Sequence, residues 1–75
     1  MRKTLEELGY EKDIDIPAMV RYKKSRKEVD TYIRFYKDDK KIEANEVVYN
    51  QSYTVELSME ELKAIYKYCE DNKWI

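Results

Sequence analysis

The stretch Tyr53-Thr-Val-Glu-Leu-Ser58-Met-Glu-Glu61 decides the fold, because a strand-like run changes there into a helix. The alternation of Tyr53, Val55 and Leu57 is typical of a β-strand with one buried face. Ser58 followed three residues later by Glu61 forms a capping box, which marks the start of a helix. The sequence therefore predicts a small sheet with a C-terminal helix docked on it.

The final helix has an apolar stripe that should face this sheet. Leu62, Ile65, Tyr66 and Cys69 follow the i, i+3, i+4, i+7 spacing of one helical face. Trp74 should fold back over the rim of the sheet, because a free terminal tryptophan would expose a large apolar surface.

Two runs before this segment also alternate, and we expect them to form a hairpin. Residues 14–24 and 29–37 each place apolar side chains at every second position. The polar link 25–28 is short enough to join antiparallel strands. The register expected from the apolar sets pairs Val20 with Ile33.

The remaining segments are shorter or less regular. Residues 42–49 predict a third strand with a bulge near Asn45 or Glu46, where the alternation breaks. Residues 53–57 predict the fourth strand. Residues 4–9 predict a short N-terminal helix that starts with a capping box and ends at the only glycine.

The expected fold class is therefore α+β, in a single domain over residues 1–75. It has a short N-terminal helix, a four-stranded antiparallel meander sheet and a C-terminal helix packed on one face. A chain of this length has room for one thin core. The expected core consists of Val20, Ile33, Phe35, Ile42, Val55, Leu57, Leu62, Ile65 and Cys69.

Composition limits the class of protein. The chain has 41% charged and 43% hydrophobic residues with 13% aromatics, which disfavours disorder. The net charge of −1 argues against a general polyanion binder, although residues 21–41 hold nine basic against four acidic residues. A single cysteine and the lack of a long apolar run predict a soluble intracellular protein with no membrane contact.

The residue types also bear on catalysis. The sequence has no histidine, which is the commonest general base and metal ligand, and one glycine, so a phosphate-cradling loop is not expected. Cys69 lies on the apolar helix stripe, as expected of a core cysteine. We therefore expect no enzyme activity, no catalytic residue, no metal and no cofactor.

The strongest candidate surface is the sheet face away from the core. Tyrosine and arginine alternate there. Such a face can act as a protein-binding hot spot or can stack nucleic-acid bases, and in the simplest interpretation it is a solvated face. Glu43 on the same face argues against nucleic acid. The expected binding residues are Met19, Arg21, Tyr32, Arg34 and Tyr36.

The basic tip of the first hairpin is a second candidate, for anions. Its residues are Lys23, Lys24, Arg26 and Lys27. The simpler interpretation is a solvated run that protects a strand edge from aggregation.

Three stretches resemble one group of small uncharacterised proteins encoded by phages and prophages of low-GC Gram-positive bacteria. They are Leu5-Glu-Glu-Leu-Gly-Tyr10, Tyr32-Ile-Arg-Phe-Tyr36 and Ser58-Met-Glu-Glu-Leu-Lys-Ala-Ile65, followed by Trp74. Members often end in Gly-Trp, whereas Asn72-Lys73 precedes Trp74 here. The resemblance implies a phage or mobile-element origin and a bacterial host cytoplasm, and it carries over no activity or cofactor.

The sequence thus favours a non-enzymatic interaction module that binds a host protein through the open sheet face. The alternative is a weak single-stranded nucleic-acid binder that uses the same tyrosines and arginines. A third interpretation is a homo-oligomer built through an exposed strand edge.

Overall fold

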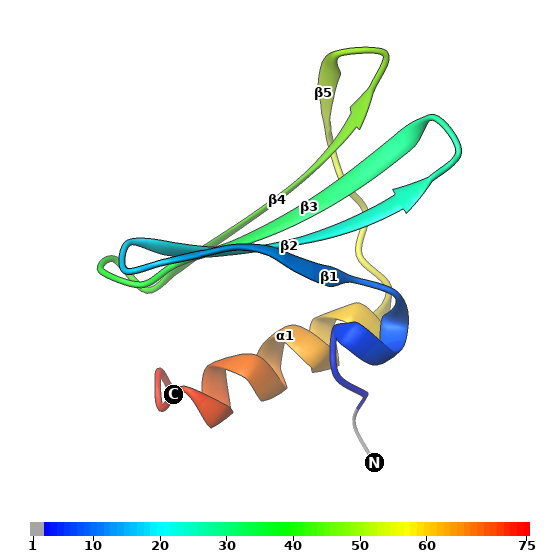
Figure 1. Cartoon of the computed structure of the whole chain (residues 1–75). Coiled ribbons are helices and arrows are strands. Elements are labelled where there is room, and N and C mark those ends of the chain that lie inside the picture. Colours follow the sequence, from blue (N-terminus) through cyan, green and yellow to red (C-terminus); the bar gives the residue numbers. More distant parts are fainter. Residues whose placement is uncertain (1–2) are drawn as a thin grey trace.

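The protein is a curved antiparallel sheet with one helix packed beneath it (Figure 1). A computed structural model describes residues 3–75. The strands follow one another in the order β1-β2-β3-β4-β5, so the sheet is a meander. The elements are a 3-10 turn (Glu6–Leu8), β1 (Glu11–Ile16), β2 (Met19–Arg26), β3 (Val29–Tyr36), β4 (Lys41–Val48), β5 (Gln51–Thr54) and α1 (Met59–Asp71).

The α+β class, the antiparallel meander and the C-terminal helix are confirmed, but the sheet has five strands rather than four. The run 14–24, which we expected to be one strand, contains a hairpin. Its turn is Pro17–Ala18, and Ile16 pairs with Met19. A two-residue turn reverses the face on which even-numbered residues lie, so the apolar alternation continues through the turn without a visible break.

The β2–β3 hairpin has the expected strands but a different register. Val20 lies opposite Phe35 rather than Ile33, because the turn consists of Lys27 and Glu28 alone instead of four residues. Lys27 has a positive φ of 47°, as tight two-residue hairpin turns require. The shift is by two residues, so the faces of both strands remain as expected.

The expected bulge in β4 is wrong. The β3–β4 register runs without interruption, and the irregularity lies in β1, between Lys12 and Ile14. Glu46 points to the helix side of β4, where it forms an ion pair with Arg26 at 3.6 Å. The polar residue that breaks the alternation is thus accommodated by a partner on β2.

The N-terminal segment is held by the expected signals although it forms only a 3-10 turn. The Thr4 N–H donates to Glu7 at 3.0 Å, and the Glu7 N–H donates back to the Thr4 hydroxyl at 3.2 Å. Gly9 has a φ of 99°, which an L side chain rarely adopts. The turn places Leu5 and Tyr10 in the core.

The core lies between the sheet and α1 and is centred on Phe35. The Phe35 ring stacks on Tyr68, with centroids 3.9 Å apart, and meets Tyr22 and Trp74 edge-on. Trp74 therefore folds back as expected. The buried hydrophobic residues are Leu5, Tyr10, Val20, Tyr22, Ile33, Phe35, Ala64, Ile65 and Cys69.

Part of the expected core is wrong. Leu62 is 50% exposed and Ile42 is 42% exposed, whereas Val55 and Leu57 are partly buried. The helix is rotated from the expected orientation, because Tyr68 packs on Phe35 and Ala64 faces the N-terminal segment. Tyr66, which we expected in the buried stripe, is exposed as well.

The α1 capping box is confirmed: Ser58 accepts from the Glu61 N–H at 3.1 Å, and the Glu61 carboxylate accepts from the Ser58 N–H at 2.9 Å. None of the helices formed by residues 3–75 has the length and apolar character needed to cross a bilayer.

Candidate functional site

The sheet face that points away from α1, here called the outer face, carries all five expected binding residues. Strand alternation places them there, because Val20, Tyr22, Ile33 and Phe35 face the helix. Met19 lies opposite Tyr36 and Arg21 lies opposite Arg34. All five of the binding residues are half-buried. The outer face includes Met19, Arg21, Lys23, Tyr32, Arg34, Tyr36, Lys41, Glu43 and Asn45, together with Ile14 and Ile16 of β1, and Asp13 lies at its rim.

Tyr32 is the centre of this face. The guanidinium carbons of Arg21 and Arg34 lie 4.6 and 5.3 Å from the centroid of its ring, and the Lys23 ammonium lies 5.8 Å from it. A cation over a tyrosine ring at an exposed site contributes about 0.5–1 kcal/mol. The three cations therefore restrict the Tyr32 ring, which favours a rigid contact surface.

Carboxylates already pair with both arginines. Arg21 donates two hydrogen bonds to Asp13, at 2.7 and 3.1 Å. These bonds hold the pKa of Asp13 below its usual range and raise that of Arg21. Arg34 donates to Glu43 at 3.4 Å and also to Asn45. The positive charge of this face is thus largely neutralised within the protein.

Tyr36 extends the same network toward the β3–β4 turn. Its hydroxyl donates to Glu43 at 3.2 Å, so Glu43 accepts from both Tyr36 and Arg34. Neighbouring strands fix each of these side chains, so the network belongs to the sheet and not to a loop. Such a face offers a partner the surface of its tyrosine rings. It also offers the outward-facing N–H groups of two oriented guanidinium groups.

Sequence reasoning found the outer face from the parity of β2 and β3, and it placed Glu43 there as well. It missed Asp13, which reaches Arg21 from the irregular part of β1. The apolar alternation over residues 14–24 does not separate β1 from β2, so it gives no sign of this contact. Recognition of Pro17–Ala18 as a turn would have brought Asp13 beside β2.

The four residues of the expected anion site do not form one site. Lys23 lies on the outer face near Tyr32, whereas the Lys24 ammonium lies 5.5 Å from the ring of Tyr10 on the helix side. Arg26 pairs with Glu46, and Lys27 occupies the turn. The basic tip is thus divided between the two faces of the sheet.

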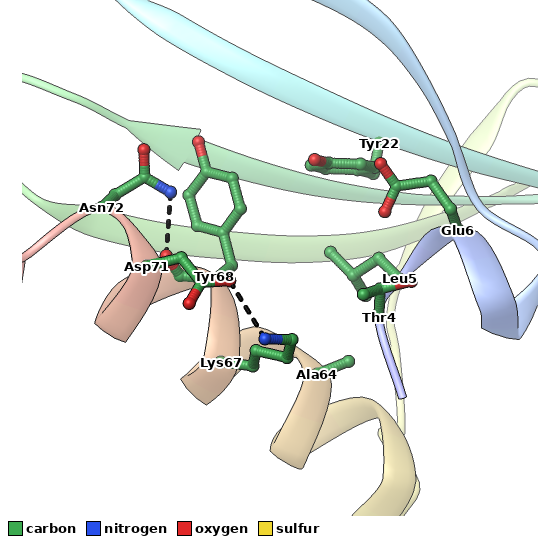
Figure 2. Close-up of a pocket in the computed structure, with 9 residues that line it drawn as sticks. All are labelled: Thr4, Leu5, Glu6, Tyr22, Ala64, Lys67, Tyr68, Asp71 and Asn72. Carbon is green, nitrogen blue, oxygen red and sulfur yellow. Dashed lines mark hydrogen bonds and ion pairs between the residues drawn. The ribbon is translucent and has the colours of Figure 1, made fainter. Parts of the chain in front are cut away.

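A small cleft of about 210 Å³ lies between α1 and the N-terminal segment (Figure 2). Tyr22 and Tyr68 line it on the sheet side, and an ion pair between Lys67 and Asp71 lies at its edge at 3.3 Å. Burial raises the pKa of Tyr22 to about 12, so its hydroxyl stays protonated near neutral pH. The cleft is smaller than the roughly 300 Å³ at which small-molecule sites begin.

Among residues 3–75, no three acidic or cysteine side chains come together in a way that could hold a metal ion. Comparison with protein-family models, with curated proteins and with solved structures finds no match to this chain.

Proposed function

We propose that this protein is a non-enzymatic interaction module that binds another protein through the outer face. The observation that carries the proposal is the arrangement of two carboxylate-paired arginines around Tyr32. Tyrosine and arginine are enriched in protein-binding hot spots, where they supply large contact area at low entropic cost. The resemblance to phage-encoded proteins suggests that the partner is a protein of the bacterial host.

The charge state of the outer face favours a protein partner over single-stranded nucleic acid. Phosphate binding relies on cations that can replace the counterions of the polymer. Arg21 and Arg34 are instead paired with Asp13 and Glu43, which would repel a phosphate backbone. Nucleic-acid binding through Tyr32 and its neighbours is the alternative, and the experiment must distinguish it from protein binding.

The experiment is a capture assay from host lysate with the full chain as bait and mass spectrometry as readout. The test variant combines Tyr32→Ala with Arg34→Ala. The matched control combines Tyr53→Ala with Arg26→Ala, which removes the same two residue types from the other face of the sheet. We expect the test variant to lose a partner that the control retains, with both variants folded by circular dichroism.

Two results contradict this proposal. One is equal capture by the test and control variants, and the other is no specific partner at all. A fluorescent oligothymidylate titrated at low and moderate salt distinguishes the alternative. Affinity that falls steeply with salt and depends on Tyr32 would assign the face to nucleic acid instead.

A further inference from the structure

Half of the β4 edge is open. β5 pairs with β4 only from Asn45 to Val48, and the chain leaves the sheet after Thr54. Figure 1 shows β5 as a short strand beside the far half of β4. No strand formed by residues 3–75 therefore lies beside Lys41–Ala44 on this side.

The backbone of this edge points outward in a predictable pattern. The pair Val48–Gln51 flanks the two-residue turn Tyr49–Asn50, so these two residues exchange both backbone hydrogen bonds. Alternate residues from Val48 along β4 point the same way, so the N–H and C=O groups of Ile42 and Ala44 face the open side. A shallow hollow of about 550 Å³ lies next to this edge on the outer face, lined mainly by Arg34, Glu43, Asn45, Ser52 and Thr54.

One flank of α1 carries exposed apolar side chains. Leu62 and Tyr66 are exposed and follow Ile65 and Cys69 around the helix surface. The opposite flank, with Ala64, lines the cleft against the N-terminal segment (Figure 2).

That arrangement fixes the side on which the apolar flank lies. The N-terminal segment leads into β1, at the other edge of the sheet (Figure 1). The flank with Leu62 and Tyr66 therefore faces the β4 side. Ile42 is on the helix side of β4, since it lies opposite Phe35. Ile42, Leu62 and Tyr66 are thus exposed on the same side of the molecule.

We propose that a second copy of this chain pairs with the open edge of β4. The edge is complementary to itself. When two β4 strands run antiparallel with a two-fold axis at Ile42, Lys41 lies opposite the partner's Glu43 on the outer face, and Glu43 lies opposite the partner's Lys41. Ile42 lies opposite the partner's Ile42, where each strand supplies an outward N–H and C=O.

The same axis brings the apolar helix flanks together. A two-fold axis perpendicular to the sheet keeps both α1 helices on the same side of the joined sheet. The Leu62 and Tyr66 flanks of the two copies then face each other on the helix side of the joined sheet. The dimer therefore adds burial of exposed apolar surface to the edge hydrogen bonds. It also places two outer faces side by side on one continuous sheet.

The other sheet edge lacks these features. β1 has a bulge between Lys12 and Ile14 and carries charged residues at four of its six positions. Bulges and charges are the means by which edge strands avoid pairing with other chains. The structure thus leaves the β4 edge as the one fitted for a second copy.

Sedimentation velocity of the full chain from micromolar to millimolar concentration tests this assembly. We expect a species of twice the 9.2 kDa chain mass that grows with concentration. Ile42→Lys places a charge at the axis and should raise the dimer dissociation constant at least tenfold. The control is Ile16→Lys, because Ile16 is a similarly exposed isoleucine at 48% on the β1 edge, and this variant should dimerise like the unaltered chain.

A second pair of variants tests the register without relying on Ile42. Lys41→Glu and Glu43→Lys should each weaken self-association, and an equimolar mixture of the two should restore a heterodimer. The proposal is overturned if the unaltered chain is monomeric at millimolar concentration. It is also overturned if Ile16→Lys, rather than Ile42→Lys, dissociates the dimer. Monomeric behaviour would leave the capture experiment on the outer face unaffected.

Discussion

Arg21 lies directly opposite Arg34 in the register of β2 and β3, and both guanidinium groups lie near the ring of Tyr32. Like charges placed opposite each other on a sheet are destabilising. Here the repulsion is offset by Asp13 on one side and Glu43 on the other. On the outer face, each of these arginines is therefore paired with one carboxylate, which offsets the repulsion between the two guanidinium groups.

Removal of Asp13 should unbalance this network. We expect Asp13→Asn to lower the free energy of unfolding by roughly 1 kcal/mol, the upper end for a partly exposed ion pair, because Arg21 then faces Arg34 without compensation. The control is Asp15→Asn, whose ion pairs with Lys12 and Lys37 are more exposed, and which should change stability by less. Urea titration measures both, and equal effects would contradict a special role for Asp13.

Truncation to alanine should lower the free energy of unfolding by very different amounts at Phe35 and Leu62, although the sequence predicts both in the core. Phe35→Ala removes a fully buried ring that contacts three other aromatic side chains, so we expect a loss of about 3–5 kcal/mol. Leu62→Ala removes a side chain that is half exposed and should cost less than about 1.5 kcal/mol, the lower limit for a fully buried leucine. Thermal or urea unfolding at low concentration, where the chain is monomeric, tests the ranking. A reversed order would contradict the helix orientation.

The faces of β2 and β3 were predictable because strand alternation is a local property. Tyr32, Arg34 and Tyr36 have the same parity, opposite to that of Ile33 and Phe35, so the outer face followed directly. The β1–β2 hairpin could not be read in this way. Its two-residue turn inverts the parity, so Ile14 and Ile16 continue the apolar pattern while they lie on the other face from Val20.

The helix orientation was not predictable from α1 alone. Leu62 and Tyr66 compete with Ala64 and Tyr68 for the same burial, and hydrophobicity favours the first pair. The contact partners decide otherwise: Phe35 stacks on Tyr68, and the N-terminal segment needs a small residue beside it. Both partners lie far from α1 in the sequence, so only the assembled fold determines which face is buried.

The end of α1 contains a backbone conformation that favours glycine. Lys73 has a φ of 60°, and the Trp74 N–H donates to the Cys69 carbonyl at 2.8 Å, which is the pattern of a Schellman motif. The resemblance noted above also placed a glycine before the terminal tryptophan. Because glycine adopts this conformation without steric cost, Lys73→Gly should raise the free energy of unfolding by about 1 kcal/mol.

The same substitution inside the helix provides the control for Lys73. Lys63 is an exposed lysine in α1, and Lys63→Gly should lower stability by about 1 kcal/mol because glycine is a poor helix former. The two lysine-to-glycine variants should therefore shift the melting temperature in opposite directions. Destabilisation by both would show that the left-handed conformation of Lys73 is not maintained in solution.

The contact between Tyr10 and Glu61 makes stability depend on pH at both extremes. The Tyr10 hydroxyl donates to the Glu61 carboxylate, and so joins the N-terminal segment to the start of α1. Burial and this hydrogen bond raise the pKa of Tyr10. Burial alone would raise the pKa of Glu61, but hydrogen bonds from Ser58 and Tyr10 outweigh it, and this pKa is lowered.

The direction of each pKa shift determines the pH range in which the group stabilises the fold. A raised tyrosine pKa contributes stability that is present below about pH 10 and lost as the pH rises above it. A lowered glutamate pKa contributes stability that is present above about pH 4.3 and lost as the pH falls below it. We therefore expect the free energy of unfolding to be highest between these limits. Tyr22, with a pKa raised to about 12, should add to the loss of stability between about pH 10 and that pH.

The Tyr10→Phe variant separates the contributions, because it keeps the buried ring and removes the titrating hydroxyl. Its free energy of unfolding should be lower near neutral pH, where the hydrogen bond is lost. It should also fall less steeply above pH 10, because only Tyr22 and the weaker tyrosine shifts remain. Urea titrations from acid to alkaline pH measure both curves. Parallel curves for the two proteins above pH 10 would show that Tyr10 is not buried against Glu61.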